Sequence, residues 1–93
     1  MDLKSLDRLH IINTYNRQPE TTLLLKRGQG VYVWDEQDKR YLDFVCGLAV
    51  NNLGHCHPQI VSAICQQAQQ LMHTSNLYYT EPQIRLAERL VKN

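Results

Sequence analysis

The stretch from residue 22 to residue 44 constrains the fold most, because short β-rich runs alternate there with turn-forming residues. The runs are Thr22–Lys26, Val31–Trp34 and Arg40–Phe44. Residues 27–30 (Arg-Gly-Gln-Gly) separate the first two runs, and residues 35–38 (Asp-Glu-Gln-Asp) separate the last two. This pattern predicts a small antiparallel meander of two or three strands. Asp38 or a neighbour is expected at a positive φ, which aspartate tolerates better than most residues other than glycine.

Three other segments indicate helices. Apolar residues recur close to a helical period between residues 5 and 15. Pro58 suits the first position of a second helix, which carries an apolar face. Thr80 and Gln83 match a capping box, in which two side chains bond to opposite backbone N–H groups at the start of a third helix. Irregular connections are expected at Gly47–Gly54 and His73–Tyr79.

Together these elements predict an α+β chain that is incomplete as a domain. A small meander and three helices leave several apolar faces with nothing in the sequence to cover them. We therefore expect the isolated chain to have low stability. The last helix runs up to the end of the sequence at Asn93, so residues 1–93 are expected to be one part of a larger fold.

Charge and hydropathy exclude several classes of partner. The 93 residues carry 10 Lys and Arg against 9 Asp and Glu, a net charge of +1, without a basic run. Such a chain has no electrostatic footprint for nucleic acid or for an anionic membrane surface. No stretch approaches the roughly 18 apolar residues of a membrane span, and the first residues lack the basic and apolar regions of a secretory signal. We expect a cytoplasmic protein.

Cysteine and histidine residues raise the question of a metal site. The cysteines are Cys46, Cys56 and Cys65. An odd number without Cys-x-x-Cys spacing does not predict a disulfide framework. The run His55-Cys56-His57, with His73 further on, contains zinc-type ligands, but adjacent residues do not easily face one ion and no known zinc spacing is completed. We expect no metal site, and a small zinc-binding protein remains an alternative hypothesis.

The residues by themselves contain no complete active site. Ser62 and Ser75 lack the glycine elbow of a nucleophilic serine. Residues 28–30 precede a predicted strand, so they do not present a helix N-terminus to a phosphate. The acidic side chains of residues 35–38 are interpreted as solvated turn residues. Asp43 is a candidate for a buried pairing, whose partner the sequence does not name.

Three blocks of sequence carry a resemblance to a known family. They are Gly28–Asp35, Lys39–Phe44 and Gly54–Pro58. In this order and spacing they resemble the N-terminal part of the class III aminotransferases, which are pyridoxal-phosphate enzymes of fold type I. Within the class, Gly47–Val50, His73–Leu77 and the pair Glu81-Pro82 are most similar to acetylornithine aminotransferases. Asp38 departs from the family pattern, which commonly has glycine in that turn.

The resemblance implies an enzyme that moves an amino group between N2-acetyl-L-ornithine and 2-oxoglutarate through lysine-bound pyridoxal 5'-phosphate, in arginine biosynthesis. This chemistry needs a Schiff-base lysine, an acid at the pyridinium nitrogen and a phosphate cup. In the family these parts follow the region that residues 1–93 resemble, so no catalytic or cofactor-binding residue carries over and the chain alone is expected to be inactive. None of its lysines occupies the family's catalytic motif. The lysines are Lys4, Lys26, Lys39 and Lys92.

The role that the resemblance implies for residues 1–93 is structural. They would build part of the small domain and the start of the large domain, the homodimer contact and one wall of the substrate entrance. Leu48 corresponds to a pocket position that is aromatic in ornithine-specific relatives, and ordinary packing is the alternative. Tyr79 lies near a second pocket aromatic, and packing or an interface is its alternative. His55 and His57 resemble turn-fixing residues and are assigned no chemistry.

Other functions stay open at this point. Class III enzymes that act on succinylornithine, succinyl-diaminopimelate or ornithine share the same motifs. A non-catalytic module that pairs with a full-length aminotransferase subunit is a further alternative.

Overall fold

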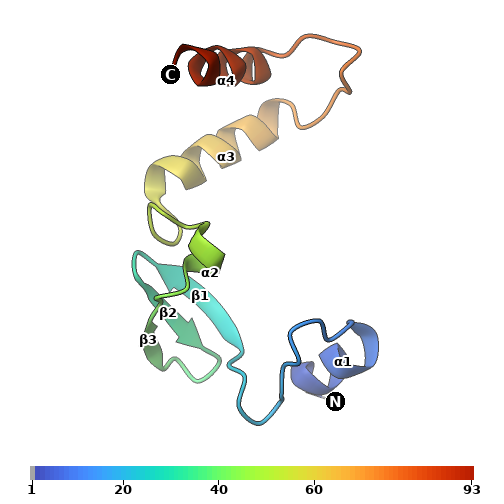
Figure 1. The fold of residues 1–93 in the computed structure, drawn as a ribbon, viewed down its shortest axis with the longest axis vertical. Coiled ribbons are helices and arrows are strands. Elements are labelled where there is room, and N and C mark those ends of the chain that lie inside the picture. The colour runs from blue at the N-terminus through green and yellow to red at the C-terminus, as the bar shows by residue number, and fades with distance from the viewer. Residues whose placement is uncertain (1) are drawn as a thin grey trace. The chain divides into compact units, whose positions relative to one another are not determined.

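The computed structural model describes residues 2–93, which form two compact units, one ending at Pro58 and the other running from Gln59 to Asn93. In chain order the elements are α1 (Leu3–His10), β1 (Leu25–Gln29), β2 (Tyr32–Asp35), β3 (Arg40–Leu42), α2 (Cys46–Ala49), α3 (Pro58–Gln70) and α4 (Glu81–Lys92) (Figure 1). None of the helices in residues 2–93 has the length and apolar character needed to cross a membrane.

Helix α1 confirms the first predicted helix but ends five residues earlier than expected, at His10 instead of Tyr15. Asp2 caps its start by accepting a hydrogen bond from the Ser5 N–H at 3.1 Å. The chain leaves the helix because Ile11 adopts an extended backbone, with φ −117° and ψ 133°. The apolar period continues past this point, so periodicity alone does not reveal the end.

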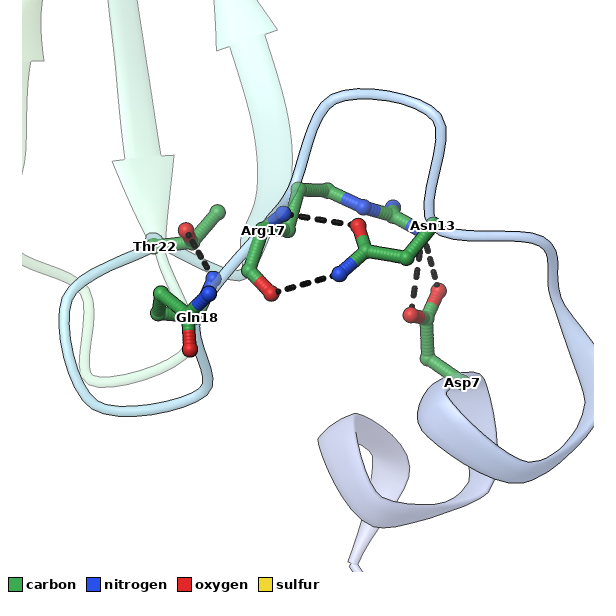
Figure 2. A network of polar contacts seen from close by, with 5 residues as sticks. All are labelled: Asp7, Asn13, Arg17, Gln18 and Thr22. Carbon is green, nitrogen blue, oxygen red and sulfur yellow. Dashed lines mark hydrogen bonds and ion pairs between the residues drawn. The ribbon is translucent and has the colours of Figure 1, made fainter.

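A polar network holds the chain that follows α1 (Figure 2). The Asn13 side chain accepts from the Arg17 N–H at 2.7 Å and donates to the Arg17 carbonyl at 3.0 Å. Such bonds offer the backbone an alternative to helical hydrogen bonds. The Arg17 guanidinium also donates to both carboxylate oxygens of Asp7 at 2.9 Å, which ties this loop back to α1. One residue further, the Gln18 N–H donates to the Thr22 hydroxyl at 3.1 Å.

The three strands form an antiparallel sheet in the order β1-β2-β3, which confirms the predicted meander (Figure 1). The predicted turn at residues 27–30 is wrong for residues 27–29, because these lie inside β1, with Gly28 opposite Val33. The hairpin turns later, between the paired residues Gln29 and Tyr32, and Gly30 takes a φ of +58° there. Glycine supplies this positive φ at little steric cost.

The second turn of the sheet contains a buried carboxylate, so the interpretation of Asp35 as a solvated turn residue is wrong. Asp35 is only 5% exposed, and its Oδ1 accepts from the N–H groups of Gln37 and Lys39, both at 2.9 Å. The Tyr41 hydroxyl donates to Oδ2 at 3.0 Å. Burial works to raise the pKa of Asp35, but these hydrogen bonds outweigh it and hold that pKa below its usual range. The predicted positive φ at Asp38 is confirmed, at +64°.

Helices α3 and α4 begin at Pro58 and next to Thr80, as predicted. The capping box is wrong in its details. Thr80 occupies the N-cap with an extended backbone, but its side chain makes no capping hydrogen bond. The Gln83 amide donates instead to the Asn76 side-chain oxygen at 3.4 Å. Glu81 in the first turn still places a negative charge at the positive end of the helix dipole.

Apolar side chains are largely exposed, as the sequence predicted. Val33 in β2 is 7% exposed, and within residues 2–93 it is the one buried apolar residue. Helices α3 and α4 contain no buried residue, and no contact joins them in this part of the chain. The described elements therefore do not close a core of their own.

Candidate functional site

The connection after β3 contains a left-handed turn that sequence reasoning missed. The residues of α2 have φ values of 54° (Cys46), 66° (Gly47), 62° (Leu48) and 63° (Ala49). Backbone hydrogen bonds close the turn, from the Ala49 N–H to the Val45 carbonyl at 3.0 Å and from the Val50 N–H to the Cys46 carbonyl at 2.8 Å. The left-handed region costs about 1–2 kcal/mol for each residue other than glycine. The sequence pattern predicts irregular chain from Gly47 onward, which is wrong for residues 47–49.

Asp43 anchors the start of this turn. Its Oδ1 accepts from the N–H groups of Val45 at 2.9 Å and Cys46 at 3.0 Å. Its Oδ2 lies 2.5 Å from His55 Nε2, and the two side chains are only 14% and 21% exposed. The hydrogen bond from the Cys46 N–H and then the contact with His55 hold the pKa of Asp43 below its usual range, against the opposing effect of burial. His55 is thus the partner that the sequence could not name.

His55 is in turn fixed to the sheet. Its N–H donates to the Gly30 carbonyl at 2.8 Å, and the Gly30 N–H donates to the His55 carbonyl at 3.1 Å. Glycines give the room for this approach: a Cβ on Gly28 would lie 2.8 Å from His55 Cγ, and a Cβ on Gly54 would lie 3.0 Å from Gly30 Cα. The expectation that His55 fixes a turn agrees with these contacts. We call Asp43, His55 and the left-handed turn Cys46–Ala49 the anchored turn.

A local signal exists for part of the anchored turn. An aspartate whose side chain accepts from the N–H groups two and three residues later is a common turn motif, and Asp43 precedes Val45 and Cys46 by these intervals. The pairing with His55 spans twelve residues. No periodicity or spacing rule identifies a contact of that length.

The two positions implied to touch substrate lie in different units. Leu48 stands on the anchored turn and is 70% exposed. Tyr79 is 96% exposed and lines a hollow of about 470 Å³ in the second unit, between the end of α3 and the start of α4. Exposure leaves both side chains available for contact, and their role toward a substrate stays a prediction.

The metal-site residues do not gather around a common point. His55 Nε2 faces Asp43, and all three cysteines are free thiols. Within residues 2–93 no three His, Cys, Asp or Glu side chains lie close enough together to hold an ion. The zinc-binding alternative therefore finds no support in this part of the chain.

Each lysine already has a partner. The contacts are Lys4 Nζ to the Pro19 carbonyl (2.8 Å), Lys26 to Asp38 (3.0 Å), Lys39 Nζ to the centre of the Tyr41 ring (5.3 Å) and Lys92 to Glu88 (2.7 Å). All four lie at least partly exposed. A lysine that forms a Schiff base is instead activated in a desolvated pocket or beside another cation. Residues 28–30 also lead into β2, so they offer no helix N-terminus to a phosphate. The described residues do not fit pyridoxal phosphate by themselves.

Comparison with known proteins decides the family. Residues 14–93 match the model of the family described as Aminotransferase class-III. The chain belongs to this family. It is 49% identical to the acetylornithine aminotransferase of Caldanaerobacter subterraneus subsp. tengcongensis over 87 residues, which are 94% of this chain and 21% of that protein. The chain thus spans about a fifth of the length of the curated relatives it matches.

Solved structures show the same relationship for this class III chain. The N-acetylornithine aminotransferase of Stenotrophomonas maltophilia K279a matches with a TM-score of 0.81 and 42% identity, over 97% of this chain and 22% of that one. The taurine:2-oxoglutarate aminotransferase of Bifidobacterium kashiwanohense, solved with pyridoxal phosphate and glutamate, matches with a TM-score of 0.84 and 36% identity, over 95% and 20%. The predicted fold class is confirmed: these helices and the sheet are the N-terminal part of a larger pyridoxal-phosphate transferase fold, and the family uses that cofactor.

Proposed function

We propose that residues 1–93 are the N-terminal part of an acetylornithine aminotransferase. The whole enzyme would transfer an amino group between N2-acetyl-L-ornithine and 2-oxoglutarate with pyridoxal phosphate, in arginine biosynthesis. The observation that carries this proposal is the 49% identity to an acetylornithine aminotransferase over 94% of the chain.

In this proposal the chain supplies structure to the enzyme and no reacting group. Residues 1–93 contribute part of the small domain and the start of the large domain, and they take part in the contact of a cytoplasmic homodimer. The exposed apolar faces of α3 and α4 support a role in packing against further protein. The engaged lysines support the expectation that residues 1–93 alone do not transaminate.

The proposed contribution to specificity is the wall of the substrate entrance. In the whole enzyme Leu48 faces the amino donor. Tyr79 is a second pocket position that the family resemblance implies, with packing or an interface as its alternative. A leucine at position 48 leaves room where ornithine-specific relatives carry an aromatic ring. One side-chain difference of this kind changes the ratio of kcat/KM values for two donors by about 10- to 200-fold.

A chimeric enzyme tests the proposal. Residues 1–93 replace the matching segment of the Caldanaerobacter acetylornithine aminotransferase, and kcat/KM is measured for N-acetylornithine, N2-succinylornithine, succinyl-diaminopimelate and ornithine with 2-oxoglutarate. The unmodified enzyme is the control. We expect N-acetylornithine to remain the preferred donor, and a switch of preference to another donor would contradict the proposal.

A second experiment addresses the isolated chain. Residues 1–93 are incubated with pyridoxal phosphate, reduced with borohydride and digested for mass spectrometry. We expect no single lysine to be labelled specifically, because all four lie at least partly exposed and none lies in a desolvated pocket that would activate it. A specific, stoichiometric adduct on one lysine would show that the chain binds the cofactor by itself.

A further inference from the structure

The anchored turn is conformationally costly, so something must hold it. Three residues other than glycine occupy left-handed backbone within this one turn: Cys46, Leu48 and Ala49. Residues in such conformations persist only where the surrounding structure over-determines them, and they cluster at sites that require a fixed geometry. Within residues 2–93 Leu48 is 70% exposed, so packing in this part of the chain does not supply the hold.

Asp43 has the right geometry to supply it. Oδ1 accepts from the N–H groups of Val45 and Cys46 at the start of the turn, while Oδ2 faces His55 at 2.5 Å. The two carboxylate oxygens therefore join the turn on one side to the histidine on the other. His55 passes this restraint to the sheet through its paired backbone hydrogen bonds with Gly30.

We propose that Asp43 and His55 are positioning residues, which hold the left-handed turn Cys46–Ala49 so that Leu48 is fixed against the amino donor. This inference rests on the proposed function for its consequence in catalysis. Neither side chain touches a reacting atom. Both act on donor discrimination through the backbone that carries Leu48.

The chimeric enzyme gives the test, read as the ratio of kcat/KM for N-acetylornithine to kcat/KM for ornithine. Asp43→Ala and His55→Ala are each expected to lower this ratio by about tenfold, within the range that one pocket contact contributes. Asp35→Ala is the matched control, because Asp35 is also a buried carboxylate that accepts from two backbone N–H groups and lies against one side chain. The control variant is expected to keep this ratio within about twofold of the ratio of the unaltered chimera. An unchanged ratio in both variants, or an equal change in the control, would overturn the proposal.

A rescue variant separates positioning from general folding. Glycine adopts left-handed backbone at little cost, so a turn with Ala49→Gly needs less restraint. The double variant Asp43→Ala with Ala49→Gly is expected to recover most of the lost ratio. If Asp43→Ala yields no soluble enzyme, recovery of soluble enzyme by Ala49→Gly supports the proposal, and failure of both variants to fold counts against it.

A second measurement does not depend on the proposed function. Native-state hydrogen exchange in the chimeric enzyme follows the Val50 N–H, which donates to the Cys46 carbonyl and closes the turn. Asp43→Ala should accelerate this exchange about tenfold, whereas Asp35→Ala should leave it within about twofold. If the chimera prefers another donor, the proposed function fails, and the exchange still decides whether Asp43 holds the turn. Equal exchange of the Val50 N–H in Asp43→Ala and in the unaltered chimera would overturn the proposal.

Discussion

Replacing Gly54 with alanine is expected to separate His55 from the sheet. Gly54 has a φ of +87°, and a Cβ built there would lie 3.0 Å from Gly30 Cα and 3.2 Å from the Gly30 carbonyl carbon and oxygen. These are backbone atoms of a tight hairpin turn, so they cannot rotate away as a flexible side chain would. Gly30 offers the matched control, since it also has a positive φ, of +58°, but a Cβ added there would meet no atom within 4 Å.

The two substitutions share one energetic cost and differ in another. Left-handed backbone costs alanine about 1–2 kcal/mol, and the lower entropy of the unfolded chain returns about 0.4–1 kcal/mol. Gly30→Ala should therefore cost about 1 kcal/mol in all. Gly54→Ala adds overpacking of about 1–3 kcal/mol, for a total of about 2–4 kcal/mol. The difference between the variants isolates the steric contact with Gly30.

Native-state hydrogen exchange in the chimeric enzyme measures this difference locally. The reporter is the His55 N–H, which donates to the Gly30 carbonyl. Each 1.4 kcal/mol lost from its protection accelerates exchange about tenfold. Exchange in Gly54→Ala should exceed that in Gly30→Ala by about five- to 150-fold. Equal exchange in the two variants would refute the close approach of Gly54 to the hairpin.

Three further predictions concern the site and the sheet. Leu48→Phe in the chimeric enzyme should lower the ratio of kcat/KM for N-acetylornithine to that for ornithine by about tenfold, and an unchanged ratio would remove Leu48 from the donor site. Because the pKa of folded Asp43 is lowered, its stabilisation of the turn should be complete above about pH 5 and decline as the pH falls below about 4, where the unfolded carboxyl takes up a proton. The protection of the Val50 N–H against hydrogen exchange in the chimeric enzyme, followed between neutral and acid pH, checks this, with Asp43→Asn as the variant that should lack the transition. Val33→Ala should cost about 1–2 kcal/mol in protection of the β2 amides, whereas Val31→Ala, at a site 58% exposed, should cost under about 0.5 kcal/mol.

Features set by short-range chemistry are predictable from the sequence. The meander follows from β-rich runs bounded by turn residues, and α3 starts where Pro58 has no N–H to lose. The positive φ of Asp38 likewise follows from the turn tolerance of aspartate. Each of these depends on side chains within a few residues of the feature.

Features set by distant contacts are not predictable in this way. The local pattern places Gly28 in a turn, because nothing nearby shows that its missing side chain makes room for the His55 ring. The same pattern predicts a solvated Asp35, although the Tyr41 hydroxyl and the turn N–H groups surround it. The left-handed turn is stabilised by Asp43, which depends on His55 twelve residues away.

The end of α1 shows the same limit at shorter range. Its apolar period continues past His10, but the hydrogen bonds between the Asn13 side chain and the Arg17 backbone compete with further helical bonds. Propensity and period describe what a segment prefers by itself. The Asn13 side chain bonds to backbone groups beyond the helix, and this ends α1 early although the helix propensity and the apolar period stay the same.

The left-handed turn also reverses the usual sign of a glycine substitution. In α3, Ala63→Gly loses helix propensity and should destabilise by about 0.5–1 kcal/mol. At Ala49, with a φ of +63°, the same substitution by glycine relieves backbone strain of about 1–2 kcal/mol and should be neutral or stabilising. In a complete substitution map of the chain, residues 46–49 would therefore stand out as a helical segment that accepts glycine and disfavours β-branched residues. Such a map would locate the turn from mutational tolerance alone.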